Sequence, residues 1–329
     1  MKKIKILATG GTISAHHANR VDFRNYISGH YSCEDITKEI PEIHDIASIE
    51  IEQLANFSST VITSSHWLQL RKRINQCLNN EGYDGIVITH GTNTLEETAY
   101  FLHLTMDTEK PIVLTGAQRP LSGLSSDAHI NLLNAVKVAS SKDSYGKGVL
   151  VALNDQISSA RDVAKTNTYR LETFQSGQLG FLGYIDPDNT VQFYRAPTRT
   201  HTIQSKFSKL EIKELPTVEI VYSYAGANGN IISSLINTTT VDGIIVAGTG
   251  AGRCSPEEEL ALKQARDKGI QVIMSSRVEN GRVVPIEKYE YLEAPTADNL
   301  SPQKARILLM VALLKYTNYD DLQAVFDQY

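Results

Sequence analysis

The sequence predicts an α/β protein built on a mostly parallel sheet. Short apolar runs alternate with amphipathic segments of helical period through most of the chain, which is the pattern of strands joined by crossover helices. Several of the runs are nearly continuous Ile, Val and Leu, as in strands that are buried on both faces of a sheet. The 329 residues, 41% of them hydrophobic, are enough for two domains with their own cores.

The predicted strands are the apolar runs at residues 3–7, 85–89, 111–115, 148–153, 217–222, 243–247 and 270–274. The predicted helices include the amphipathic segments at residues 66–78, 95–106 and 128–139. Capping residues mark where helices begin. Thr94 with Glu97 fits a capping box. Ser255-Pro256 and Ser301-Pro302 each place a capping serine before a proline at the first helical position.

A polar stretch separates two series of strands and helices. Residues 195–209 carry Pro197 and lack clear periodicity, and a new strand–helix series begins near Pro216. We therefore predict a larger N-terminal domain at residues 1–194, a linker at 195–213 and a smaller C-terminal α/β domain at 214–329.

Composition argues against several classes of partner. The net charge of −5 does not suit a nucleic-acid binder, and no run of 18 apolar residues suggests a membrane span. The short apolar stretch after the N-terminal lysines runs straight into Gly10-Gly11, as a strand entering a turn does, unlike a secretory signal. Cys33, Cys77 and Cys254 are odd in number and widely spaced, so we expect no disulfide framework and a cytoplasmic protein.

Two loops rich in threonine follow predicted strands, at residues 8–14 and 89–97. Each places hydroxyl groups at the carboxyl end of a strand, where open parallel sheets bind ligands. Gly10 and Gly11 allow a tight turn with exposed amides, which can hold an oxyanion while the Thr12 hydroxyl attacks. Thr92 lies just before a helix start, where the helix dipole favours negative charge. Taken alone, an ordinary glycine turn explains the first loop better, and helix capping explains the second equally well.

Lys165 is a third candidate, because it follows the predicted strand at 148–153. Most lysines are solvated, but a buried lysine loses proton affinity and can act as a base. His90 is predicted to be structural and to bond to backbone. Residues 248–252 resemble a dinucleotide-binding loop only weakly, because the next predicted strand ends in Ser275-Ser276 where a ribose-binding carboxylate is expected. We therefore predict neither a cofactor nor a metal.

Together these segments resemble the bacterial-type L-asparaginase/glutaminase family over essentially the whole chain. Besides the two threonine loops, the resemblance rests on residues 115–120, 161–168, 221–225, 275–277 and 302–306. It implies that Thr12 is the nucleophile that forms an acyl-enzyme and that Tyr26 assists it. It also implies that Thr92 and Lys165 activate the nucleophile or the hydrolytic water.

The resemblance further implies how an amino-acid amide binds. Ser59 corresponds to the serine that holds the α-carboxylate, and the Ala117 carbonyl corresponds to the group that receives the amide nitrogen. The remaining residues assigned to substrate binding are Gly11, Thr60, Gly91 and Asn93. Members of the family form homo-oligomers, usually dimers of dimers, in which the partner's C-terminal domain completes the site; Glu287 is the loosely aligned acidic candidate there.

Several positions depart from the family pattern. Asn93 stands where aspartate normally contacts the substrate ammonium and pairs with the lysine. Thr60 and Val61 replace a polar and an acidic residue, and Ala251 replaces an asparagine. Losing a close ion pair costs about 1–3 kcal/mol, so L-asparagine should bind about tenfold to a hundredfold more weakly. Loss of a counter-charge should also lower the pKa of Lys165.

The sequence therefore leaves several functions open. The first is an asparaginase with weakened ammonium recognition, and the second is an amidase for an amide that lacks a free α-amino group. A non-catalytic sensor is an alternative of another class, although it would not need four catalytic side chains. The subunit of a tRNA-dependent amidotransferase usually has an added N-terminal domain, whereas the first threonine loop here begins at residue 8.

Overall fold

The chain divides into two compact units, Met1–Leu210 and Glu211–Tyr329, in a computed structural model that describes residues 1–238 and 240–329. Both units are α/β, and the first is the larger, as the sequence predicts. The domain boundaries at 194/195 and 213/214 stay predictions. Within the described ranges, no helix is long and apolar enough to cross a membrane.

The N-terminal unit contains an eight-stranded sheet in the order β10-β9-β6-β5-β4-β3-β1-β2. The five strands from β5 to β2 pair in parallel, and β6, β9 and β10 extend the sheet with antiparallel pairs. The strands are β1 Lys2–Gly10, β2 Ala47–Phe57, β3 Gly85–Thr89, β4 Ile112–Thr115, β5 Val149–Leu153, β6 Gln156–Ser159, β9 Gly183–Ile185 and β10 Val191–Phe193. All four strands predicted in this unit are present.

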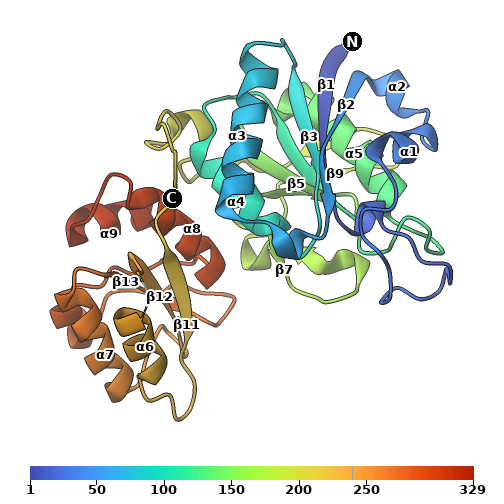
Figure 1. Cartoon of the computed structure of the whole chain (residues 1–329). Helices are drawn as coiled ribbons and strands as arrows, with labels where there is room; N and C mark the ends of the chain where they lie inside the picture. The colour runs from blue at the N-terminus through green and yellow to red at the C-terminus, as the bar shows by residue number, and fades with distance from the viewer. Residues whose placement is uncertain (239) are drawn as a thin grey trace. The chain divides into compact units, whose positions relative to one another are not determined.

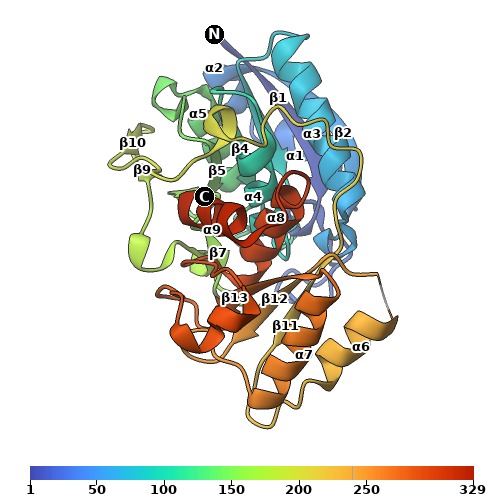
Figure 2. The same cartoon turned by 90° about the vertical axis from the view of Figure 1, so that its left-hand side faces the viewer.

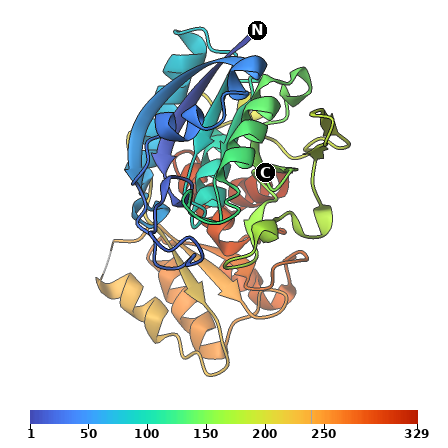
Figure 3. The same ribbon diagram turned by 90° about the vertical axis from the view of Figure 1, so that its right-hand side faces the viewer.

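Helices cover both faces of this sheet. On one face, α1 Cys33–Lys38, α2 Ile43–Ile46 and α5 Ala128–Ser140 share a core with β1, β3 and β4. The other face carries α3 Ser64–Asn79 and α4 Leu95–Thr105 (Figure 1). Figure 3 shows the first of these faces, with α5 in green. The strands between the two layers read as continuous apolar runs because both of their faces are buried.

Strand β2 is the main element that the apolar-run criterion misses. It alternates half-buried and exposed positions along residues such as Ile49, Glu50 and Ile51, because it lies at the edge of the sheet and pairs only with β1 among the described strands. A half-buried strand has a period of two and lacks a continuous apolar run.

The C-terminal unit is a three-stranded parallel sheet with helices on both faces. Its strands are β11 Val218–Tyr222, β12 Gly243–Gly248 and β13 Gln271–Ser276, in that order. Helices α6 Asn230–Thr238 and α7 Pro256–Asp267 lie side by side on one face (Figure 2). On the other face, α8 Pro302–Ala312 packs on the sheet and is followed by α9 Tyr319–Gln328.

Short elements complete the chain. Strands β7 Ala164–Lys165 and β8 Phe174–Gln175 form a separate two-stranded ribbon. The 3₁₀ helices are η1 Thr12–Ser14, η2 Ser59–Val61, η3 Lys142–Ser144, η4 Leu171–Thr173, η5 Gly177–Leu179, η6 Thr202–Gln204 and η7 Glu287–Leu292.

Two of the three predicted helix caps are confirmed. Ser255 forms a capping box with Glu258, and the Ser301 side chain accepts a hydrogen bond from the Lys304 backbone N–H. The predicted box between Thr94 and Glu97 is wrong. Thr94 occupies the N-cap position, but its hydroxyl donates to the Ser59 carbonyl at 2.9 Å, so it ties α4 to another loop.

Candidate active site

The first threonine loop leaves the sheet at the end of β1. Gly11 has a φ of 92°, a region that favours glycine, and its backbone N–H donates to the Phe57 carbonyl at 2.9 Å. Thr12 follows at the start of η1 and is 7% exposed. The Thr12 hydroxyl lies 3.0 Å from the Tyr26 hydroxyl. The structure therefore brings together two of the predicted catalytic side chains.

The two threonine loops touch through glycines. A Cβ on Gly11 would lie 2.3 Å from the Gly91 Cα, and a Cβ on Gly91 would lie 2.7 Å from the Ser59 Oγ. Both distances are too short for real atoms. The contact between the two loops therefore requires glycine at 11, and the contact with Ser59 requires glycine at 91. Thr12 and Thr92 each come directly after one of these glycines, which places the two threonines on contacting backbones.

The second loop also holds the lysine. The Lys165 Nζ donates to the Thr92 Oγ1 at 2.8 Å, and burial lowers the pKa of Lys165, which the negative charge of Glu96 partly opposes. The predicted lowering is confirmed in direction. Its main cause is burial, and Glu96 is a counter-charge that the sequence analysis missed.

His90 fixes the conformation of the second loop. Its Nδ1 lies 2.8 Å from the Gly91 carbonyl, its Nε2 lies 2.9 Å from the Thr98 hydroxyl, and that hydroxyl accepts a hydrogen bond from the Trp67 indole. A carbonyl only accepts, so Nδ1 carries the proton and Nε2 accepts from Thr98. Burial lowers the pKa of His90 to about 4, which keeps the ring neutral at pH 7. The histidine is structural, as predicted, and bonds to backbone.

A third loop contains Ala117 and is held by carboxamide and carboxylate groups. The Asp127 carboxylate accepts from the backbone N–H groups of Gln118 and Arg119 at 2.9 and 3.0 Å. Asn131 donates to the Gly116 carbonyl at 3.0 Å. The sequence analysis missed this support. Asp127 has the sequence features of a residue at the start of a helix, and these do not indicate that it binds a loop nine residues earlier.

Polar atoms beside these loops remain available to a ligand. Among the described residues, the Ser59 Oγ is buried without a hydrogen-bond partner, and so is the Gln118 Nε2. Buried polar atoms are normally satisfied, so these two sites suit a polar molecule. Asn93 and Thr60 are exposed, and Thr60 bonds to the neighbouring Ser58.

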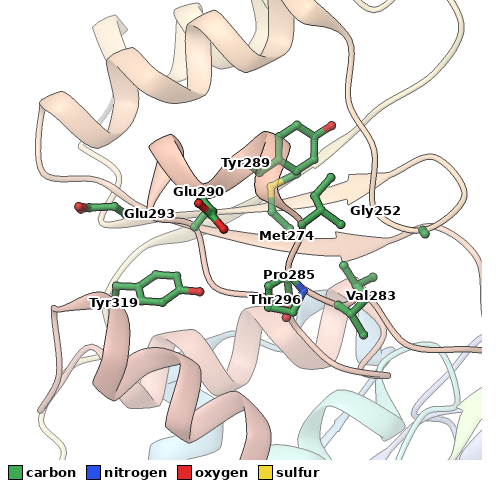
Figure 4. A pocket seen from close by; sticks show the side chains of 13 residues that line it. Gly252, Met274, Val283, Pro285, Tyr289, Glu290, Glu293, Thr296 and Tyr319 are labelled. Carbon is green, nitrogen blue, oxygen red and sulfur yellow. The ribbon is translucent and has the colours of Figure 1, made fainter.

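The two remaining candidates lie in the C-terminal unit. Ala251 follows β12, and Glu287 is the first residue of η7. A cavity of about 380 Å³ in this unit is lined by Ala251 and by residues such as Met274, Val283 and Tyr319 (Figure 4). None of the four predicted catalytic residues lines it, so the candidate active site is defined by the bonds between its side chains and not by this cavity.

The arrangement defines a class of protein. A buried hydroxyl at a strand end, a second hydroxyl bonded to a half-buried lysine, and two unsatisfied polar atoms suit an enzyme that attacks a carbonyl group and hydrolyses the resulting ester. Within residues 1–238 and 240–329, no group of three or more His, Cys, Asp or Glu residues is placed to hold a metal ion.

Comparison with known proteins identifies the family. The family model "Asparaginase, N-terminal" matches residues 3–199, and "Glutaminase/Asparaginase C-terminal domain" matches residues 217–326. L-asparaginase 2 of Bacillus subtilis (strain 168) is 42% identical over 100% of this chain and 87% of that protein. Glutaminase-asparaginase of Pseudomonas fluorescens biotype A is 41% identical over 100% of this chain and 91% of its own length.

A solved structure agrees with the sequence relatives. The probable cytoplasmic L-asparaginase from Campylobacter jejuni matches with a TM-score of 0.96 and 41% identity, and the match covers 100% of both chains. The chain therefore belongs to the asparaginase family of amidohydrolases.

The contact between Gly91 and Ser59 can be tested by substitution. Gly91→Ala should lower the free energy of unfolding by about 1–3 kcal/mol, because the new methyl overlaps the Ser59 side chain. Ser59→Gly in the same chain should recover part of that loss, because it removes the Ser59 Cβ and Oγ and leaves the backbone nitrogen at 3.0 Å. Urea unfolding of the wild type, both single variants and the double variant measures the coupling. Strictly additive losses would contradict the contact.

Proposed function

We propose that this chain is an L-asparaginase that hydrolyses L-asparagine to L-aspartate and ammonia with Thr12 as nucleophile. The observation that carries the proposal is the pairing of Thr12 with Tyr26 at 3.0 Å and of Thr92 with Lys165 at 2.8 Å on two loops in backbone contact. Membership of the asparaginase family supports the same chemistry.

The proposed reaction has two steps. The Thr12 oxygen attacks the side-chain amide carbon while Tyr26 takes part in moving the hydroxyl proton. The C–N bond then breaks, the nitrogen leaves as ammonia with the added proton, and an ester remains on Thr12. In the second step Lys165, in its neutral form, draws a proton through Thr92 from water. The hydroxide so formed adds to the ester carbonyl, the carbonyl carbon–oxygen bond to Thr12 breaks, and the proton held by Lys165 passes to the Thr12 oxygen and restores its hydroxyl.

Substrate binding is proposed for the loops around these groups. The Ser59 hydroxyl, which is buried without a partner among the described residues, is suited to the α-carboxylate. The Ala117 carbonyl receives the amide nitrogen, and backbone groups at Gly11 and Gly91 approach the substrate closely. Thr60 and Asn93 contribute from the exposed side. No cofactor takes part in this scheme.

The nucleophile assignment predicts a large loss in Thr12→Ala. Removing the attacking oxygen should lower kcat for ammonia release by about a thousandfold or more, whereas Thr12→Ser keeps a hydroxyl and should retain far more activity. The assay measures ammonia from L-asparagine, L-glutamine, succinamate and N-acetyl-asparagine. Near-wild-type activity in Thr12→Ala would overturn the assignment. No ammonia from any amide with the wild type would favour the non-catalytic sensor.

Asn93 favours a second candidate substrate. Residue 93 carries no charge, so an amide without a free α-amino group loses no ion pair at this position. The ammonium of L-asparagine, in contrast, finds no negative charge at residue 93. On this reading the chain is an asparaginase-type amidase for such an amide. The two candidates differ in the ratio of KM values for L-asparagine and succinamate.

Restoring a carboxylate at position 93 tests this account. Asn93→Asp should lower KM for L-asparagine by about tenfold to a hundredfold, because a new ion pair forms with the ammonium. KM for succinamate, which has no ammonium, is the control and should not fall. A wild-type KM for L-asparagine in the low micromolar range would reject the second candidate. An unchanged KM in the variant would reject the role given to Asn93.

We also propose a cytoplasmic homo-oligomer, a dimer or a dimer of dimers, in which Glu287 of one subunit completes the partner's site. Likeness to the Campylobacter jejuni protein supports the compartment. Cell fractionation should recover the protein with cytoplasmic markers, and mass photometry should give two or four times the chain mass. A monomer, or recovery with periplasmic markers, would contradict the respective part of the proposal.

A further inference from the structure

Lys165 is carried by an unusually small element. Strand β7 has only two residues, Ala164 and Lys165, and pairs on one side with β8 through Lys165 and Phe174. Its backbone N–H at Lys165 is not used in that pairing and donates instead to a carboxylate oxygen of Glu96. Glu96 belongs to α4, so this bond joins the lysine strand to the helix that follows the Thr92 loop.

With this bond, Lys165 is held by hydrogen bonds at both its backbone and its side chain. The Lys165 Nζ donates to Thr92, three residues before α4 begins, while the Lys165 backbone donates to the second residue of the same helix. Both ends of the lysine are therefore fixed to one short segment, residues 92–96. A lysine side chain has many rotamers. Fixing its backbone limits the positions that the amine can reach and helps to keep the amine at the Thr92 hydroxyl.

From these contacts we infer that Glu96 is a positioning residue for Lys165, both as the backbone anchor of β7 and through its negative charge, which acts on the amine. The inference rests on the proposed role of Lys165 as a base. It assigns Glu96 the counter-charge that the uncharged Asn93 does not supply.

Glu96 lies at the start of a helix. It is half-buried in the first turn of α4, where the unpaired N–H groups and the helix dipole stabilise an anion. Its charge raises the pKa of Lys165, against the lowering that burial causes.

Other titratable groups near the lysine have different partners or positions. Glu97 lies in the same helical turn. Arg161 and Asp162 pair with each other at 3.1 Å before β7 begins, and the Tyr26 hydroxyl is paired with Thr12. In the part of the chain that the structure describes, burial and Glu96 are the influences found on the pKa of Lys165.

Glu96→Gln separates the charge of Glu96 from its hydrogen bond to the Lys165 backbone. The amide oxygen can still accept from the Lys165 backbone, but the charge is gone, so the pKa of Lys165 should fall. Because the neutral amine acts as the base, the rise of kcat with pH should move to lower pH. Glu97→Gln removes a charge from the same turn and should leave that midpoint unchanged.

Glu96→Ala removes the anchor as well. Its kcat at the optimum should fall by about tenfold to a hundredfold below that of Glu96→Gln, because a shift of about 1 Å in a catalytic group has an effect of this size. KM should change little, since Glu96 is not among the residues proposed to bind the substrate. If the alanine variant does not fold, the pH profile of Glu96→Gln still decides the question.

Lys165→Met distinguishes failure of this inference from failure of the proposed function. An inactive Lys165→Met together with a Glu96→Gln profile identical to wild type would overturn the role of Glu96 alone. A Lys165→Met variant that is as active as wild type would overturn the role of the lysine itself. The expected result is an inactive Lys165→Met and a displaced profile for Glu96→Gln only.

Discussion

The contact between Gly11 and Gly91 is the constraint on which the candidate site depends. A methyl group at position 11 would lie 2.3 Å from the Gly91 Cα, so the two loops can approach this closely only because residue 11 has no side chain. Each glycine is followed by a threonine, and the separation of the two hydroxyl-bearing residues is therefore set by backbone contact. Rigid backbone is better suited than mobile side chains to hold reacting groups in place.

The sequence predicts much of the fold and the two threonines of the candidate site, because the patterns that indicate them are local. Continuous apolar runs gave the central strands, and the glycine–threonine loops directly after them gave Thr12 and Thr92. Strand β2 was missed because an edge strand is only half-buried. Glu96 was missed because its partner Lys165 lies 69 positions away, and no local pattern encodes such a contact.

Burial and a nearby charge both act on the pKa of the Lys165 amine. Burial lowers the pKa of Lys165, and Glu96 opposes that effect. From the sequence, the lowering follows from the uncharged Asn93, and burial is only a general condition for a lysine that acts as a base; in the structure, removal of the amine from water is the larger cause. The Thr94 hydroxyl illustrates the same limit, because it fits a helix cap by sequence but bonds instead to the Ser59 carbonyl.

The chain of hydrogen bonds from Trp67 through Thr98 and His90 to Gly91 has an optical consequence. The sequence contains one tryptophan, and its indole is stacked on Phe101 at 5.3 Å between ring centroids. The protein therefore carries an intrinsic fluorophore that is joined by hydrogen bonds to the second threonine loop. Its emission can follow rearrangement of that loop during turnover without any added label.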